Sequence, residues 1–326
     1  MIPGASAFRS VASHEAAAQG RVTPTARLAQ RERADMKYAV CNWLFKGIGF
    51  RESCREIARH GFQGVEIAHF TLFDDPAAVS EAEVREIRQA LDDTGLSFTG
   101  FHAVFFRPAN LHITSPDPEV RARSWDHLRR LIEIAGRLGG GNLVLGSPTQ
   151  RRAVGIPTEC AVDYLREHLT GLAPYARDRT SRILIEALPA TDTNVITTLA
   201  EAHRLILSID HPAIGGMFDF HNSAAEGRAW SELIEEHADI IQHVHLNELD
   251  GSHPREGGSD FEPAFRSLTR VQYAGWVSLE IFQQPDAPGV VLAETKRLLE
   301  NMEGRLRGQS PRLSTEAEND RRRAGP

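Results

Sequence analysis

The sequence predicts a single-domain α/β fold, a (β/α)8 barrel in which eight parallel strands each precede a helix. Three observations predict this fold. Short apolar runs alternate with amphipathic stretches eight times between residues 36 and 304. The last four apolar runs each carry an acidic side chain or a histidine at or near the C-terminal end, where the strands of a barrel present their chemistry. A doubly wound open sheet is the alternative, but no glycine fingerprint follows the first run.

The predicted strands are short apolar runs. In the first half of the chain they are YAVCNW (38–43), GVEIAHF (64–70), SFTGFHAVF (97–105) and NLVLGSP (142–148). In the second half they are ILIEALP (183–189), IGGMFDFHN (214–222), IIQHVHLNE (240–248) and WVSLEIF (276–282).

Each predicted strand is followed by apolar residues three and four positions apart, which is the pattern of an amphipathic helix. The predicted helices span residues 49–60, 80–94, 117–138, 157–177, 194–208, 228–238, 261–271 and 288–304. Ser80 with Glu83 three residues on predicts a capping box at the start of the second helix. Gly61, Gly95 and Gly139 lie where helices should end.

Two polar tails flank the predicted barrel domain, which spans residues 36–304. Residues 1–35 are rich in small residues and arginine, and residues 305–326 lack the apolar periodicity that offsets the entropy of ordering. We therefore predict both tails to be disordered. Met36, immediately before the first strand, is a candidate for the true start of the protein.

Composition narrows the classes of function. The formal charge of -7 opposes nucleic-acid binding as the main task. No apolar stretch approaches the roughly 20 residues that cross a bilayer, and residues 1–35 show no apolar core of a secretory signal. Three separate cysteines, Cys41, Cys54 and Cys160, indicate reduced thiols. We expect a cytoplasmic protein that binds neither membranes nor nucleic acid.

The strongest functional signal is the series Glu186, Asp219, His245 and Glu280, one residue from each of the last four strands. Taken singly, such a carboxylate is often a helix cap and such a histidine a core residue. Taken together, four charged or polar groups among buried neighbours are hard to explain without a cation. Three carboxylates and one imidazole suit Mn²⁺, Mg²⁺ or Co²⁺, and Zn²⁺ is less favoured.

Four segments carry a resemblance to a known family: ILIEALP, FDFHN, HVHLNE followed by GGSDF, and AGWVSLEIF. They resemble the xylose-isomerase-like TIM barrels, which include ketose 3-epimerases, hydroxypyruvate isomerases and inosose dehydratases. The resemblance spans about residues 36–304. It implies that Glu186, Asp219, His245 and Glu280 bind one divalent metal ion, with Mn²⁺ preferred. It also implies a dimer or tetramer, and a complex with a different subunit is an alternative.

The expected reaction is isomerisation or epimerisation of a keto sugar or related polyol. A cation that holds two adjacent substrate oxygens polarises the carbonyl and stabilises the enediolate that forms when the neighbouring carbon loses its proton. Glu186 and Glu280 then act as the acid and base from opposite sides of the sugar. The resemblance to ketose epimerases implies this pair, but which glutamate is the base stays open.

Further residues are candidates for contact with the substrate. They are His102, His221, Glu248, Trp43 and Glu66. In the resembled epimerases the substrate histidine lies three residues after the aspartate, where this chain has Asn222, and Gly251 replaces an expected arginine. These two departures disfavour a strict ketose 3-epimerase.

Other functions remain as alternatives. The same metal site serves a lyase on keto sugars or keto-cyclitols, either a dehydratase or an enzyme that cleaves 3-keto C-glycosides. A zinc AP endonuclease needs further histidines, and the fourth strand ends in Gly146, Ser147 and Pro148 instead. A Schiff-base aldolase is disfavoured because none of the three lysines ends a later strand. The non-catalytic alternative is a sugar-binding barrel.

Overall fold

The computed structural model describes residues 36–283 and 287–308, and within them eight parallel strands close into a barrel in sequence order. The strands are β1 (Lys37–Cys41), β2 (Gly64–Ala68), β3 (Ser97–His102), β4 (Asn142–Leu145), β5 (Arg182–Ile185), β6 (Ile214–Asp219), β7 (Ile241–Leu246) and β8 (Trp276–Leu279). Pairing of β8 with β1 closes the barrel. The predicted fold class is confirmed.

All eight strands end earlier than the apolar runs predict. β5 ends at Ile185 and β8 at Leu279, so Glu186 and Glu280 are the first residues beyond their strands. Asp219 is the last residue of β6, whereas His245 still lies within β7. All four therefore stand at the carboxyl end of the barrel, where the loops that follow the strands meet.

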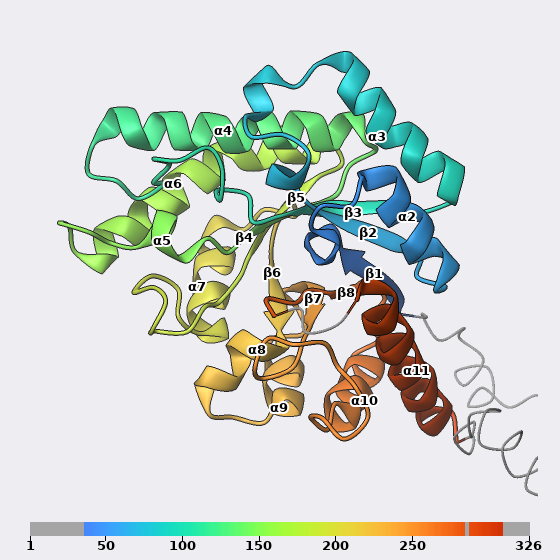
Figure 1. The fold of residues 1–326 in the computed structure, drawn as a ribbon. Coiled ribbons are helices and arrows are strands. Elements are labelled where there is room, and N and C mark those ends of the chain that lie inside the picture. The colour runs from blue at the N-terminus through green and yellow to red at the C-terminus, as the bar shows by residue number, and fades with distance from the viewer. Residues whose placement is uncertain (1–35, 284–286, 309–326) are drawn as a thin grey trace, which may run out of the picture. The chain divides into compact units, whose positions relative to one another are not determined.

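Helices surround the strands on the outside, as Figure 1 shows. They are α2 (Phe50–Arg59), α3 (Glu81–Thr94), α4 (Pro118–Arg137), α5 (Pro148–Arg151), α6 (Thr158–Arg177), α7 (Leu199–Ile209), α8 (Phe220–Ser223), α9 (Trp230–Glu236), α10 (Glu262–Arg270) and α11 (Pro288–Leu306). The capping box of Ser80 and Glu83 is present, and Gly95 caps the end of α3 in the left-handed region. The expected helix at 194–208 begins only at Leu199, because Ile196 has a φ of 57° that no α-helix accommodates.

Short 3₁₀ helices occupy several of the loops that follow the strands. They are η1 (Asn42–Phe45), η2 (His69–Thr71), η3 (Pro76–Ala78) and η4 (Ala224–Glu226). The sequence patterns did not predict them, because three or four residues are too few to show a period. They matter for the site because η1 carries Trp43 to the carboxyl end of the barrel.

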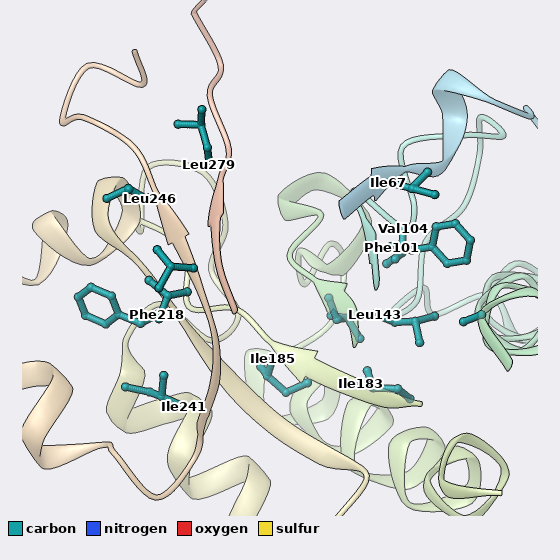
Figure 2. Close-up of a cluster of buried hydrophobic side chains, with 14 of the residues drawn as sticks. Ile67, Phe101, Val104, Leu143, Ile183, Ile185, Phe218, Ile241, Leu246 and Leu279 are labelled. Atoms are coloured by element: carbon teal, nitrogen blue, oxygen red, sulfur yellow. The ribbon is translucent and has the colours of Figure 1, made fainter. Parts of the chain in front are cut away.

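The core has two layers because side chains alternate between the faces of each strand. Most buried apolar side chains lie between strands and helices, among them Phe101, Ile183 and Ile185 in Figure 2. A separate small cluster consists of Val144, Leu184 and Met217, which alternate with these outward-facing neighbours and so face the interior of the barrel.

His69 of η2 is fully buried beside His127, with 5.5 Å between the ring centroids. Burial and His127 lower the pKa of His69 from 6.5 to about 3. Between these two pH values the unfolded chain binds a proton at this position and the folded chain does not. Acidification from pH 6.5 toward 3 therefore lowers the free energy of unfolding, by about 1.4 kcal/mol per pH unit from this group.

We expect the free energy of unfolding of His69→Phe to fall less steeply with acid than that of the wild type, because phenylalanine binds no proton. Urea unfolding at about pH 6.5, 5.5 and 4.5 measures the slope for both proteins. A slope that matches the wild type would contradict a neutral, buried His69.

The predicted disordered tails lie almost wholly outside the described residues. Only residues 305–308 of these tails are described, and α11 extends two residues into them, to Leu306. Within the described ranges, no helix combines the length and the apolar character that a membrane crossing requires.

Candidate metal centre

Side chains from the ends of β5, β6, β7 and β8 converge on one ring nitrogen. The Nδ1 atom of His245 lies 3.6 Å from Oδ2 of Asp219, 3.8 Å from Oε2 of Glu280 and 3.9 Å from Oε1 of Glu186. All four side chains are buried. The structure thus brings together the four residues that the sequence analysis selects as ligands.

The donor atoms of this cluster are arranged as if for a cation. Ligand atoms of Glu186, Asp219 and His245 all lie within 4.8 Å of one another. Within the described part of the chain, Nδ1 of His245 is buried without a hydrogen-bond partner. Three carboxylates buried together repel one another unless a positive charge lies between them. The residues therefore fit a divalent metal ion, and oxygen-rich donors with one imidazole suit Mn²⁺ or Mg²⁺.

Glu66 lies on the other side of His245. Its fully buried carboxylate is 3.1 Å from Nε2 of His245 and 3.1 Å from Nε2 of His243, and it accepts a hydrogen bond of 2.8 Å from Oγ of Ser278. Burial raises the pKa of Glu66, but the two histidines outweigh it and lower that pKa well below the ordinary value. Because Glu66 holds Nε2, the Nδ1 atom is the one that faces the three carboxylates.

Burial alone lowers the pKa of His245, but Glu66, Asp219 and Glu280 raise it well above the ordinary value. The negative charge of these carboxylates, which stabilises a proton on His245, would also stabilise a metal ion at Nδ1. An imidazole must give up that proton to bind a metal, so proton and cation compete for this atom.

Two asparagines orient the carboxylates. The Nδ2 atom of Asn247 donates to Oδ2 of Asp219 at 3.0 Å and to Oε2 of Glu280 at 3.3 Å. The Nδ2 atom of Asn222 donates to Oε1 of Glu186 at 3.0 Å, and its main-chain N–H donates to Oδ1 of Asp219 at 2.6 Å. Each carboxylate thus keeps a defined rotamer even though like charges surround it.

Glu186 has the most constrained surroundings. Burial and the neighbouring Asp219 raise the pKa of Glu186 to about 7. A Cβ at Gly146 would lie 2.0 Å from Oε2 of Glu186, so any side chain at this position would displace the carboxylate. The main-chain oxygen of Glu186 accepts a hydrogen bond of 2.7 Å from the fully buried guanidinium of Arg151, which also binds the carbonyl of Ile196 at 3.1 Å.

Two of the predicted substrate residues border the cluster. His102 ends β3, and its Nε2 lies 3.1 Å from Oε1 of Glu280. Burial lowers the pKa of His102, but Glu280 outweighs burial and raises it. The half-buried ring of Trp43 lies 6.3 Å from the ring of His102. Trp43 and His102 thus form one wall beside the four carboxylate and imidazole groups.

The other predicted substrate residues lie elsewhere. His221 is half-buried, and its ring packs 5.4 Å from Phe282. Glu248 turns toward the loop after β7, where its carboxylate accepts hydrogen bonds from the main-chain N–H and the Oγ of Ser259 at 3.1 and 2.5 Å. Glu66 lies beneath His245 instead of lining the mouth of the barrel. The structure therefore does not bring Glu248 or Glu66 to the open side of the cluster.

Sequence reasoning missed Asn247, Asn222 as an orienting group, and Arg151. Asn247 directly follows the apolar part of β7 in the segment HVHLNE, and a polar residue at that point was a usable signal. Arg151 left no signal, because its partners are main-chain carbonyls of three separate segments.

Comparison with known proteins gives one family match and several relatives. A family model described as xylose isomerase-like TIM barrel matches residues 54–302. The D-psicose 3-epimerase of Agrobacterium fabrum is 24% identical over 233 residues, which cover 70% of this chain and 77% of that protein. The 3-dehydro-D-guloside 4-epimerase of Escherichia coli is 24% identical over 263 residues, which cover 75% of this chain and 92% of that protein.

Among solved structures, an L-ribulose 3-epimerase superposes with a TM-score of 0.72 at 19% identity. The superposition covers 90% of this chain and 100% of that one. At this identity the likeness establishes the barrel fold alone.

Proposed function

Since the chain belongs to the xylose isomerase-like TIM barrel family, we propose that it is a divalent-metal-dependent epimerase or isomerase that acts on a keto sugar. The observation that carries the proposal is the convergence of Glu186, Asp219 and Glu280 on Nδ1 of His245. These four residues are the proposed ligands, and Mn²⁺ is the proposed ion. The epimerases among the relatives favour a reaction that inverts a carbon next to the carbonyl by removing and returning its proton.

A bound divalent cation would supply the positive charge that polarises the substrate carbonyl and makes the neighbouring C–H acidic. The chain itself has to move the proton. Glu186 and Glu280 come from β5 and β8, and both carboxylates lie beside His245. We assign them the two proton transfers, one as base and the other as acid.

His102 and Trp43 are proposed to contact the sugar. Nε2 of His102, beside Glu280, can form a hydrogen bond with a substrate hydroxyl or share the proton that Glu280 transfers. Trp43 offers a ring face on which a sugar can pack. His221, at the mouth, is proposed as a further contact, and Glu248 is proposed to act indirectly, by fixing the loop that ends at Ser259.

Deuterium uptake tests the proposed function. The protein is incubated with Mn²⁺ in D₂O and a panel of free ketoses and 3-keto glycosides. At least one of these compounds should gain deuterium at the carbon next to the carbonyl. The name of the E. coli relative is the reason for including glycosides. Product analysis by NMR separates an epimer from loss of a β-leaving group, which identifies a lyase. No exchange with any member would contradict the proposal.

Glu66 is proposed as a positioning residue that directs Nδ1 of His245 toward the ligand carboxylates. We expect Glu66→Gln to weaken Mn²⁺ binding about 10- to 100-fold, because the amide cannot bind two imidazoles as a carboxylate does. Calorimetric titration with Mn²⁺ measures the change. Glu300→Gln, at an exposed position on α11, is the matched control and should bind Mn²⁺ like the wild type. Equal affinity in Glu66→Gln would remove its assigned role.

A further inference from the structure

Three aromatic rings from the loops after β1, β2 and β3 form a continuous surface, which we call the aromatic platform: Trp43, Phe70 and Phe106. The ring centroids lie 5.1 Å apart for Trp43 and Phe70, 5.6 Å for Trp43 and Phe106, and 4.4 Å for Phe70 and Phe106. Phe106 is 48% exposed. A large aromatic side chain that stays half exposed beside two other rings is typical of a binding surface and not of a core.

The aromatic platform is continuous with the proposed metal site. His102 lies between them, with its ring 5.1 Å from His245 and 6.3 Å from Trp43. Trp43 is therefore the ring nearest the site, and Phe106 lies one ring further out. A sugar whose reacting carbon lies at the carboxylates can reach Trp43, but a group on Phe106 has to extend beyond the sugar.

Exposed apolar side chains concentrate around the same mouth. Among the described residues, the exposed large hydrophobic side chains are Ile48, Phe106, Val154, Leu207, Leu249, Phe282 and Val290. All but Leu207 lie in a loop after a strand or in the first turn of α11. Leu207 alone lies well within a helix, α7. The apolar surface is therefore a property of the carboxyl end of the barrel, where substrates enter.

Phe282, two residues after Glu280 in the loop that follows β8, adds a further apolar side chain from the other end of the barrel sequence. It is 44% exposed and packs on His221. A Cβ at Gly251 would lie 2.8 Å from its ring, so the loop after β7 presses closely on this phenylalanine and holds it in place. The ring is thus fixed at the mouth although nearly half of it faces solvent.

We propose that the substrate is a keto sugar that carries an aromatic aglycone, and that the aglycone binds on the aromatic platform at Phe70 and Phe106. This substrate class rests on the proposed function of the same site. A free ketose held at the carboxylates can pack a C–H face on Trp43, but Phe70 and Phe106 lie a further ring beyond Trp43 and would gain no contact from the sugar itself. An aryl group matches these rings in offset or edge-to-face contact and gains from burial of the exposed half of Phe106.

The cations at the platform agree with this choice. Lys46 Nζ lies 5.6 Å from the Trp43 ring centroid, and the Arg107 guanidinium lies 6.0 Å from that of Phe106. Positive charge at this edge disfavours a cationic aglycone and favours an electron-rich or phenolic ring.

Paired glycosides that differ only in the aglycone test the proposal. Calorimetry with Mn²⁺-loaded protein compares methyl and phenyl 3-keto-β-D-glucopyranoside. We expect the phenyl compound to bind at least about tenfold more tightly. Phe106→Ala should reduce this ratio to about threefold or less. Leu207→Ala, which removes an exposed hydrophobic side chain on α7, is the matched control and should keep the full ratio.

Three results would overturn the proposal. The first is equal affinity of the wild type for the two glycosides. The second is an equal loss of affinity for both in Phe106→Ala. The third is a smaller oligomer of Phe106→Ala in light scattering with an unchanged ratio, which would show that a second copy of the chain covers the platform. Binding needs no turnover, so a phenyl preference without deuterium exchange would refute the proposed function and leave the platform standing.

Discussion

Glu280→Gln is expected to lower kcat for epimerisation about 10³-fold, with Mn²⁺ at saturation. The amide keeps the shape of the side chain and its acceptor for Nδ2 of Asn247. It cannot take or return a proton, and positioned general acid–base groups contribute about 10² to 10⁴ in rate. Steady-state kinetics on the best substrate of the panel measures kcat, and NMR in D₂O measures proton exchange.

Matched variants decide whether this loss is chemical. Glu186→Gln should lose turnover to a similar degree, because each glutamate serves one of the two proton transfers. Glu300→Gln should keep the wild-type rate, since that side chain is exposed on α11. Full turnover in Glu280→Gln at saturating Mn²⁺ would refute the assignment of Glu280 as acid or base.

Asp219→Asn is expected to abolish stable metal binding, with an affinity loss beyond the roughly 100-fold that residues behind a ligand can cause. In the wild type, Oδ1 of Asp219 accepts the main-chain N–H of Asn222, and Oδ2 faces His245 and Asn247. An asparagine that keeps its oxygen toward Asn222 must turn its NH₂ group toward Nδ2 of Asn247, which is also a donor. The charge and the ligand atom are lost together.

Thermal unfolding with and without Mn²⁺, together with the metal content by mass spectrometry, measures this effect. A site filled at 100 times its Kd stabilises the wild type by about 2.7 kcal/mol, and Asp219→Asn should lose that gain. Asp126→Asn on the exposed face of α4 is the control and should keep it. Retention of one metal ion per chain in Asp219→Asn would contradict the proposed ligand set.

Local patterns in the sequence were sufficient for the barrel. Apolar runs and helical periods recur eight times, and the confirmed capping box of Ser80 shows that even a helix start was readable. The helix start at Leu199 was not readable, because the left-handed backbone at Ile196 precedes it and its carbonyl is held by Arg151. Such a distant contact leaves no trace in the neighbouring residues.

Glu66 illustrates which features of the site could be predicted from neighbouring residues and which could not. Its position near the end of β2 suggested the wall of the pocket. The alternation of Val65, Glu66 and Ile67 placed it in the barrel interior instead, and β7 and β8 decided what it meets there. Alternation along one strand is visible in a sequence, whereas the strand across the barrel is not.

By itself the sequence determined where the eight strands fall along the chain and which four side chains stand at the ends of the last four. Both follow from local patterns of apolar and polar residues. Only the tertiary structure decided which nitrogen of His245 faces the carboxylates, which amides orient them, and that three aromatic rings adjoin the site. Glu66 and His245 are 179 residues apart. Contacts of that kind arise only when the barrel closes, so no segment taken alone contains them.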